Sequence, residues 1–166
     1  LLYSRAQIRK RVTELAKAIT ADYPERGFVV VAVLNGAVVF LADLLRALRQ
    51  DVRLGFVRVS SYGTSAESSG LPVIQIPNDL PVAGEDVLIV EDILDTGLSM
   101  TLLCEAIQAR SPASLRICVL IDKTQRRLHT VKPDYVGFEL SSGFVVGYGM
   151  DYAERYRSLP EVFTVD

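Results

Sequence analysis

The sequence predicts an α/β domain in which a mainly parallel β-sheet carries helices on both faces. Apolar, β-branched runs of the kind found in strands covered on both faces recur along the chain, the clearest at residues 27–34 (GFVVVAVL). Segments with the apolar spacing of helices lie between these runs. Strands that alternate with helices pair in parallel through βαβ crossovers. The length of 166 residues suits one domain of ordinary size.

The elements are expected in the following order. Ser4 and Gln7 form a capping box that starts the first helix. The apolar residues of that helix fall on one face, namely Ile8, Val12, Leu15, Ala16 and Ile19. The later elements are strand 27–34, helix 37–48, strand 52–60, strand 73–76, strand 86–93, helix 98–110, strand 115–121 and strand 135–138. Residues 60–70 are small and polar with one aromatic side chain, so they predict a mobile loop.

Composition and charge exclude several classes of protein. Hydrophobic residues make up 49% of the chain, which is too many for a disordered protein. The net charge of -2 argues against a protein that coats nucleic acid, because such proteins are usually basic. The two cysteines, Cys104 and Cys118, form no CxxC pair, so we expect reduced packing residues and no disulfide scaffold or structural zinc.

No segment of the sequence predicts a membrane span. The longest uncharged stretch, residues 27–42, is shorter than the roughly 20 apolar residues that a membrane helix needs. The first residues also lack the basic stretch and apolar block of a signal peptide. The expectation is therefore a soluble, cytoplasmic protein with no membrane partner.

The most informative segment is residues 91–99 (EDILDTGLS), which follows an apolar strand and leads into a helix. A glycine-containing turn at a helix N-terminus directs backbone N–H groups at one point, which suits a phosphate. Thr96 and Ser99 add hydroxyl groups, and Glu91 and Asp92 suit ribose hydroxyls or Mg²⁺. The simpler interpretation is an acidic helix N-terminus with a Ser or Thr cap. The whole pattern favours a phosphate site, although neither a Walker A loop nor a GxGxxG motif occurs.

The stretch VLIVEDILDTGLSM, residues 87–100, resembles the phosphoribosyl-pyrophosphate (PRPP) motif of the type I phosphoribosyltransferases, in the version found in hypoxanthine-guanine enzymes. LNGAVVFLADLL (34–45) resembles the family's pyrophosphate loop with its helix, and VSSYG (59–63) its flexible catalytic loop. DKTQRR (122–127) and residues 132–162 resemble its purine-binding hood. The resemblance implies the type I phosphoribosyltransferase fold in a single domain, residues 1–166. Its parts are a core at about 20–125, a hood at about 1–10 and 126–166, and a mobile loop at about 60–72.

In this family a purine displaces pyrophosphate from C1 of PRPP to give a nucleoside monophosphate, with Mg²⁺ as the cofactor. By resemblance, Glu91 and Asp92 hold the ribose hydroxyls directly or through Mg²⁺. Asp95 matches the acid near purine N7, the proposed general base, and could also cap the helix. The 5′-phosphate cradle is carried over onto Asp95, Thr96, Gly97, Leu98 and Ser99.

The resemblance also assigns the purine site. Lys123 matches the lysine that donates to the 6-oxo group, which favours hypoxanthine and guanine over adenine. Phe144 matches the aromatic residue that stacks on the purine, and Val145 the residue whose backbone contacts its pyrimidine edge. Without the family, Val145 reads as strand core. Asp151 completes this set and matches a carboxylate near a second Mg²⁺ on the pyrophosphate side.

The pyrophosphate side is assigned in the same way. Asn35 and Gly36 match a loop that often contains a non-proline cis peptide, and Arg157 matches an arginine that reaches pyrophosphate. Ser61 and Tyr62 match the loop that closes over the site and excludes water.

The chain departs from the family pattern at three positions. Many relatives carry lysine at the positions of Asn35 and Leu98, and Gly143 replaces a lysine or similar residue beside Phe144. These departures leave the reaction class intact and bear on substrate preference and affinity.

His129 is expected at the surface, and the pair Arg126-Arg127 at the surface or at an oligomer interface. Arg127 is also expected to help orient the Lys123 side chain.

Two other functions remain open at this point. One is a phosphoribosyltransferase that prefers xanthine, and the other is a regulatory protein that keeps the PRPP site on the same fold. The resemblance implies a homodimer or homotetramer, with the apolar helix after Asn35 as a candidate interface. The expected partners are PRPP and a 6-oxopurine, with no nucleic acid.

Overall fold

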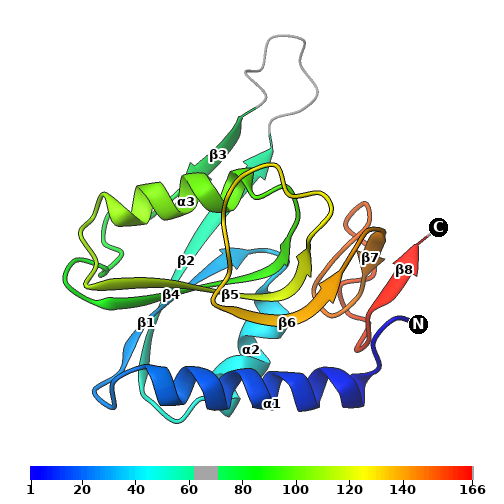
Figure 1. Ribbon diagram of the computed structural model, residues 1–166, viewed down its shortest axis with the longest axis horizontal. Helices are drawn as coiled ribbons and strands as arrows, with labels where there is room; N and C mark the ends of the chain where they lie inside the picture. Colours follow the sequence, from blue (N-terminus) through cyan, green and yellow to red (C-terminus); the bar gives the residue numbers. More distant parts are fainter. Residues whose placement is uncertain (62–70, 166) are drawn as a thin grey trace.

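Six strands form a central sheet in the computed structural model, which describes residues 1–61 and 71–165. Across the sheet the strands are β3 (Pro72–Gln75), β2 (Val52–Ser61), β1 (Phe28–Leu34), β4 (Asp86–Leu94), β5 (Ser114–Lys123) and β6 (Tyr135–Leu140). The β2–β3 pair is antiparallel, and the other neighbours are parallel. The mainly parallel sheet is confirmed (Figure 1).

Helices cover both faces of this sheet. Helix α1 (Arg5–Asp22) and helix α2 (Val38–Ala47) lie on one side, and helix α3 (Leu98–Gln108) lies on the other (Figure 1). In β1, Val30 and Ala32 pack into the α1–α2 core, whereas Val29 and Val31 pack into the α3 core. Burial on both faces explains why this strand reads as an unbroken apolar run.

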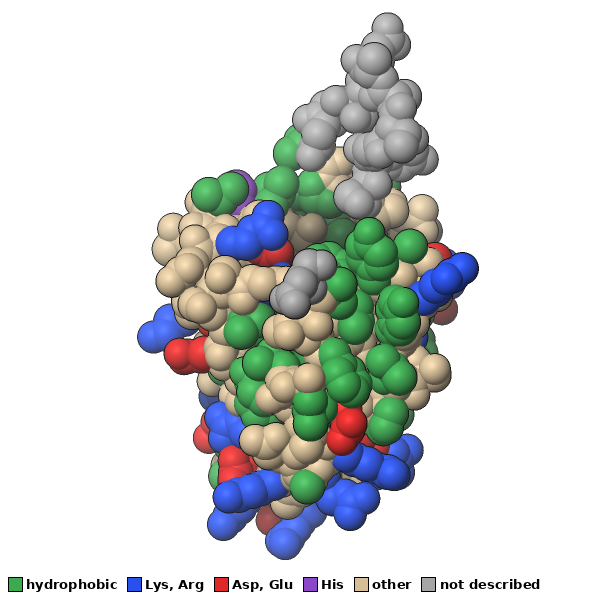
Figure 2. Space-filling model, turned by 90° about the vertical axis from the view of Figure 1, so that its right-hand side faces the viewer, with side chains coloured by type: hydrophobic (Ala, Val, Ile, Leu, Met, Phe, Trp, Pro, Cys, Tyr) green, Lys and Arg blue, Asp and Glu red, His purple; other side chains and the backbone are tan. Residues whose placement is uncertain are grey.

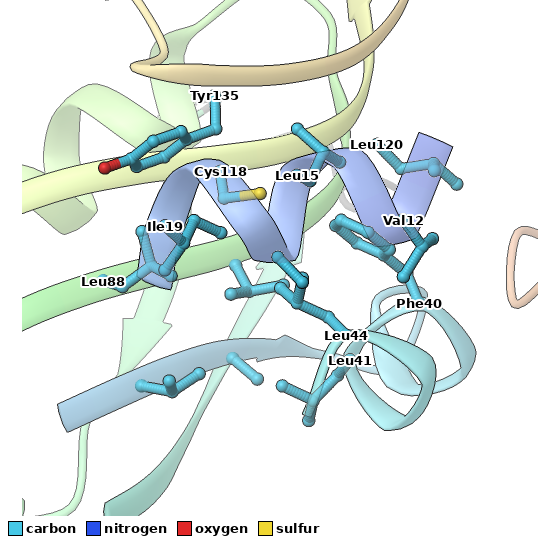
Figure 3. Packing of buried hydrophobic residues seen from close by; sticks show 14 of the residues in the cluster. Val12, Leu15, Ile19, Phe40, Leu41, Leu44, Leu88, Cys118, Leu120 and Tyr135 are labelled. Carbon is cyan, nitrogen blue, oxygen red and sulfur yellow. The ribbon is translucent and has the colours of Figure 1, made fainter. Parts of the chain in front are cut away.

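The core beneath α1 is built from the helical stripe that the sequence predicts. Val12, Leu15 and Ile19 of α1 face Phe40 and Leu44 of α2 (Figure 3). The capping box of Ser4 and Gln7 is present at the start of α1. Burial of each large apolar side chain in this core contributes about 1.5–3 kcal/mol to folding. This packing holds α2 and the loop before it in place.

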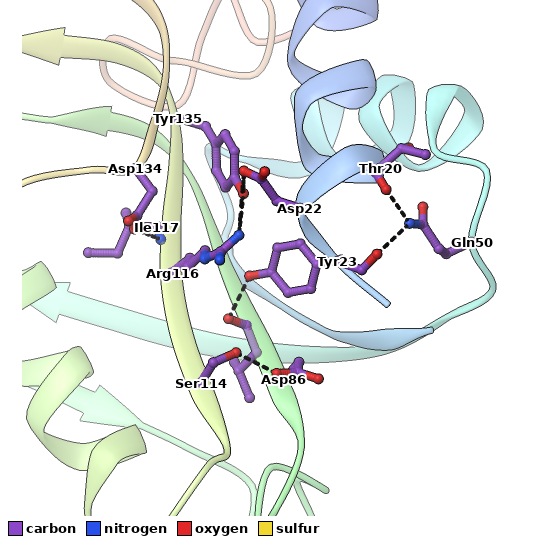
Figure 4. A network of polar contacts seen from close by, with 11 residues as sticks. Thr20, Asp22, Tyr23, Gln50, Asp86, Ser114, Arg116, Ile117, Asp134 and Tyr135 are labelled. Atoms are coloured by element: carbon purple, nitrogen blue, oxygen red, sulfur yellow. Dashed lines mark hydrogen bonds and ion pairs between the residues drawn. The ribbon is translucent and has the colours of Figure 1, made fainter. Parts of the chain in front are cut away.

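A polar network fixes the other end of α1, at the beginning of the parallel strands (Figure 4). The Tyr23 hydroxyl donates to the Val87 carbonyl at 3.0 Å, and the Tyr135 hydroxyl donates to Asp22 at 2.7 Å. Arg116 donates to the Tyr135 hydroxyl at 2.9 Å. Burial and, after it, the hydrogen bond to Asp22 raise the pKa of Tyr135 to about 12, whereas Arg116 acts to lower it. The network ties α1 to β4, β5 and β6.

A second, two-stranded sheet lies beside the carboxyl edge of the main sheet. It pairs β7 (Phe144–Val146) with β8 (Phe163–Val165) in an antiparallel manner. A bridge between Tyr3 and Val162 brings the two ends of the chain together there (Figure 1). Strand β8 is not among the strands expected from the sequence.

The helices and the strands of the main sheet match the predicted elements to within a few residues, with one informative difference. Strand β5 continues to Lys123, so Asp122 and Lys123 are buried strand residues. The helix predicted at 98–110 ends at Gln108.

Cys104 and Cys118 are both free, as expected. Across residues 1–61 and 71–165, no helix has the length and apolar character needed to cross a membrane.

Candidate active site

The carboxyl ends of β1 and β4 open into a pocket of about 320 Å³. This position, beyond the carboxyl ends of parallel strands, is where α/β sheets bind their ligands. The pocket collects most of the predicted phosphate, ribose and pyrophosphate residues: Asn35, Gly36, Glu91, Asp92, Asp95, Thr96, Gly97, Ser99, Asp151 and Arg157. Leu98, Lys123, Phe144 and Val145 do not line it. Ile93 does line it, and sequence reasoning missed this apolar residue inside an acidic motif.

The turn between β4 and α3 is capped by backbone geometry and not by a side chain. Gly97 is the N-cap of α3 with φ of 88°, and no side chain accepts a hydrogen bond from the first turn. The interpretation of this segment as a helix capped by Ser, Thr or Asp95 is therefore wrong. A Cβ atom on Gly97 would lie 2.9 Å from both Arg127 and Val131, so the turn requires glycine.

The segment that follows β5 supports the turn from behind. The Thr96 carbonyl accepts hydrogen bonds from the backbone N–H groups of Leu128 at 2.9 Å and His129 at 3.1 Å. These bonds fix the orientation of the Thr96 peptide group while Thr96 and Ser99 remain in the pocket lining. The turn is therefore preorganised for an anion.

Arg127 is the main side-chain support of this turn. Its guanidinium donates to the carbonyl oxygens of Asp95 at 3.1 Å and Val131 at 2.6 Å, and to the Asp122 carboxylate. The side chain is only 17% exposed. The expectation of a solvated or interface residue is wrong for Arg127, because its five donors meet several carbonyl groups that the turn leaves free. Its contacts reach Asp122, beside Lys123, and not Lys123 itself.

Lys123 and Asp95 form an ion pair at the edge of the pocket. Lys123 Nζ lies 3.5 Å from Asp95 Oδ2, and the lysine side chain is 5% exposed. Arg126 Nε approaches Asp95 Oδ1 at 3.3 Å, yet that buried oxygen has no hydrogen-bond partner in the described part of the chain. A buried acceptor without a partner is costly unless a ligand satisfies it. The pair therefore offers a ligand one donor and one adjacent acceptor.

Glu91 and Asp92 place two carboxyl groups next to each other on the pocket floor. The Asp92 N–H donates to Glu91 Oε1 at 3.2 Å. Burial, and after it the charge of Asp92, raises the pKa of Glu91 well above its ordinary value. Within residues 1–61 and 71–165, neither group forms an ion pair with a lysine or arginine. An additional positive charge would relieve their mutual repulsion.

Asn35 and Gly36 belong to a tightly packed loop between β1 and α2. The peptide between Leu34 and Asn35 is cis, as the resemblance implied. A side chain on Gly36 would collide with the Asp92 carboxylate, and one on Gly149 would collide with the Gly36 carbonyl oxygen. The loop is thus clamped between β4 and the segment after β7.

Asp151 and Arg157 pair on the opposite wall. Arg157 lies 2.8 Å from Asp151 Oδ1 and donates to the Gly149 carbonyl at 2.8 Å. Asp151 Oδ2 accepts a hydrogen bond from the Glu154 N–H at 2.8 Å. The arginine therefore presents a fixed, partly neutralised cation to the pocket.

The predicted purine-stacking residue lies outside the pocket lining. Phe144 is 45% exposed, and its ring meets the edge of Tyr152 with 5.5 Å between centroids. The Val145 side chain is 3% exposed and belongs to the core, as the interpretation without the family anticipated. Ser61 ends β2, whereas Tyr62 and most of the predicted mobile loop lie outside the described residues.

The pocket carboxylates suit Mg²⁺ as part of a larger set of ligands. No group of three or more His, Cys, Asp or Glu side chains in the described residues is arranged to hold a metal by itself. Mg²⁺ commonly binds through one or two carboxylates together with substrate phosphates and water. The adjacent Glu91 and Asp92, without an ion-pair partner among these residues, fit that requirement.

Comparison with known proteins agrees with this geometry. The family model described as "Phosphoribosyl transferase domain" matches residues 2–153. The chain belongs to the phosphoribosyltransferase family. This confirms the resemblance seen in residues 87–100 and the type I phosphoribosyltransferase fold.

Several relatives are similar over at least nine-tenths of their length. The hypoxanthine-guanine phosphoribosyltransferase of Aquifex aeolicus is 45% identical, covering 100% of this chain and 94% of the relative. The Bacillus subtilis enzyme of the same name is 43% identical, covering 98% of this chain and 90% of the relative. A crystal structure of a Bacillus anthracis hypoxanthine-guanine phosphoribosyltransferase has a TM-score of 0.92 and 40% identity, covering 99% of this chain and 97% of that one.

Proposed function

We propose that this chain transfers the 5-phosphoribosyl group of PRPP to N9 of hypoxanthine or guanine, giving IMP or GMP and pyrophosphate. The observation that carries the proposal is the Lys123–Asp95 pair beside a preorganised phosphate turn. The full-length similarity to hypoxanthine-guanine phosphoribosyltransferases supports the same reaction. The activity serves purine salvage.

The pair suits one edge of a 6-oxopurine. Such a ring carries the acceptor O6 next to N7, which bears a proton in one tautomer. Lys123 donates to O6, and Asp95 Oδ1, which has no hydrogen-bond partner among the described residues, accepts the N7 proton. Adenine has an amino donor in place of O6, so it would leave Lys123 facing another donor. Phe144 stacks on the ring, the Val145 backbone contacts its pyrimidine edge, and Ile93 lines the neighbouring pocket.

The phosphate groups occupy the remaining subsites. The 5′-phosphate binds the turn formed by Asp95, Thr96, Gly97, Leu98 and Ser99. A helix N-terminus offers backbone N–H groups to a phosphate, and Thr96 and Ser99 line the pocket there. Pyrophosphate binds the backbone of Asn35 and Gly36 and the Arg157 guanidinium, with Ser61 and Tyr62 closing over it. Because Asn35 replaces a lysine, this loop contributes backbone groups and an amide without a charge.

Glu91 and Asp92 hold Mg²⁺ together with the ribose hydroxyls, and Asp151 lies near a second ion on the pyrophosphate side. When bound, Mg²⁺ supplies positive charge that neutralises the departing pyrophosphate. The Asp151 oxygens each accept one protein contact and retain a free lone pair.

The transfer forms one bond and breaks one. The lone pair on purine N9 attacks C1 of the ribose as the bond from C1 to the pyrophosphate oxygen breaks, and pyrophosphate leaves with that electron pair. Asp95 takes the N7 proton, which neutralises the positive charge that develops on the purine. Lys123 stabilises negative charge on O6. A general base at this position contributes about 10²–10⁴-fold in rate.

We further propose how the chain is organised and how it assembles. Residues 1–166 form one domain, with a core at about 20–125 and a hood from about 1–10 and 126–166. The chain-end bridge between Tyr3 and Val162 and the β7–β8 sheet support this hood. The protein forms a homodimer or homotetramer, and the exposed Val38 of α2 supports that helix as an interface element. We place it in the cytoplasm, where PRPP and purines are available.

The test offers the protein a choice of purines. The chain is incubated with PRPP, Mg²⁺ and equal amounts of hypoxanthine, guanine, xanthine and adenine, and the nucleotides formed are identified. IMP and GMP should dominate. Xanthylate as the main product would establish the xanthine-preferring alternative, adenylate would contradict the role of Lys123, and no nucleotide would favour a regulatory protein.

A further inference from the structure

A second cavity, larger than the active-site pocket, lies between α1, α2 and residues 157–160. Its volume is about 520 Å³, against about 320 Å³ for the pocket at the carboxyl ends of the strands. We call it the arginine groove, because its walls carry Arg5 and Arg9 of α1, Arg46 of α2, and Arg157. Figure 2 shows Lys and Arg side chains gathered at the lower end of the molecule, with some Asp and Glu among them, at the level where Figure 1 places α1.

Two of these arginines have charges that the described residues do not neutralise. Asp43, the acidic residue in the lining, pairs with Arg46 and also accepts a hydrogen bond from the Tyr148 hydroxyl at 2.6 Å. Arg157 is bound to Asp151 and to the Gly149 carbonyl. Arg5 and Arg9 lie within 4.0 Å of no carboxylate in the described part of the chain. A ligand with two or more negative charges would complement them.

The floor of the groove is apolar. Ile8 and Val12 of α1 and Leu159 contribute to it, and Thr13 and Ser158 add hydroxyl groups. A basic rim over an apolar floor suits a molecule that combines phosphate groups with a ring. The volume also falls in the range of pockets that hold small ligands, about 300–1,000 Å³.

We propose that the arginine groove binds a small polyphosphorylated molecule, with its phosphates on Arg5 and Arg9. The two arginines are spaced i and i+4 on α1, so they project from the same side of the helix. One phosphate chain can contact both guanidinium groups, which bind phosphate oxygens in a bidentate manner. The groove shares Arg157 with the PRPP pocket, and its other lining residues are different.

The test is calorimetric titration of the full chain with ATP, inorganic triphosphate and adenosine. The variant is Arg5→Ala with Arg9→Ala, and the matched control is Lys10→Ala with Lys17→Ala on the same helix but outside the groove. All four residues are exposed, and alanine preserves the helix. The phosphorylated probes should bind the wild type and the control equally, and the arginine variant at least about tenfold more weakly. Adenosine should bind weakly to all three.

The arms of this experiment separate the possible occupants. Tighter binding of ATP than of triphosphate supports a nucleotide, and equal binding supports an inorganic polyphosphate. Binding of both probes that survives in the arginine variant, or no binding to the wild type, overturns the proposal. So does a result in which the arginine variant only dissociates the oligomer in sedimentation, since the groove would then hold a second copy of the chain. Transferase activity of the arginine variant should be unchanged. A failure of the groove proposal can therefore be told apart from a failure of the proposed transferase function.

Discussion

Lys123 Nζ lies 3.5 Å from Asp95 Oδ2, and this contact joins the end of β5 to the turn that leads into α3. The contact sets the Lys123 ammonium group, a donor, beside the Asp95 carboxylate, an acceptor. O6 and N7 are likewise neighbours on the edge of a 6-oxopurine. The two side chains come from segments 28 residues apart in sequence. Parallel pairing of β4 with β5, which aligns Leu94 with Asp122, brings them together.

Replacing Asp95 with asparagine removes the proton acceptor while it keeps the shape of the side chain. We expect kcat to fall by about two orders of magnitude or more, with the KM for PRPP largely unchanged. Steady-state kinetics with hypoxanthine measure both quantities. Asp79→Asn, an exposed aspartate outside the pocket, is the matched control and should be fully active. Full activity of Asp95→Asn would remove the general-base role.

Replacing Lys123 with alanine tests purine discrimination. The variant loses the donor to O6, so the KM for hypoxanthine should rise by about tenfold or more, and the ratio of hypoxanthine to adenine turnover should fall. Competition assays with the two bases report that ratio. Lys132→Ala, an exposed lysine beyond the pocket, serves as the control. An unchanged ratio would show that Lys123 does not read the 6-position.

Arg127→Lys tests the support behind the phosphate turn. Lysine keeps the charge but cannot bond Asp95, Val131 and Asp122 at the same time. The KM for PRPP should rise by about tenfold, and the free energy of unfolding should fall by about 1–3 kcal/mol. Arg49→Lys is the control, because Arg49 is exposed and lies outside the pocket lining. Equal effects of the two substitutions would contradict the positioning role of Arg127.

The raised pKa of Glu91 predicts how stability changes with pH. The folded chain keeps the Glu91 proton above the ordinary value of 4.5, whereas the unfolded chain loses it there. The folded state therefore binds more protons above that pH, and this group lowers the free energy of unfolding as the pH rises. Glutamine does not titrate, so Glu91→Gln removes this fall in the free energy of unfolding. In the absence of Mg²⁺, the stability of the variant relative to wild type should increase from pH 4.5 to neutral pH.

Urea unfolding of both proteins across this pH range measures the difference. The exposed Glu139→Gln provides a control that should follow the wild type. A wild type and Glu91→Gln pair with parallel pH profiles would contradict the raised pKa.

Addition of Mg²⁺ should stabilise the wild type by mass action if the ion binds the folded state. The increase in melting temperature should be smaller in Asp92→Asn, because one of the two adjacent carboxylates is lost. Differential scanning calorimetry with and without Mg²⁺ provides the comparison, and Asp79→Asn is again the control. An equal increase in all three proteins would place the ion elsewhere.

Much of the fold could be predicted because its signals are local. The apolar run of β1 and the stripe of α1 follow from periodicity, and the capping box follows from Ser4 and Gln7. Strand β8 was not predicted, since a three-residue strand has no periodicity of its own and depends on pairing with β7.

The candidate site, like the fold, could be predicted where its residues stand together in the sequence. The acidic motif and its glycine turn stand together in the sequence, so residues 91–99 could be assigned to one pocket. Arg127 could not be assigned, because its partners are backbone carbonyl groups of Asp95 and Val131 that no side-chain pattern reveals. The apolar Ile93 was missed for a related reason, as nothing in its type distinguishes a pocket wall from a core residue.

The most direct test of the account is a crystal structure of the chain with bound IMP. We predict Lys123 Nζ about 3 Å from O6, an Asp95 carboxylate oxygen at hydrogen-bond distance from N7, and the 5′-phosphate on the turn at residues 95–99. The Phe144 ring should stack on the purine. A nucleotide whose phosphate occupies the turn while its purine lies away from both Lys123 and Asp95 would contradict the central claim.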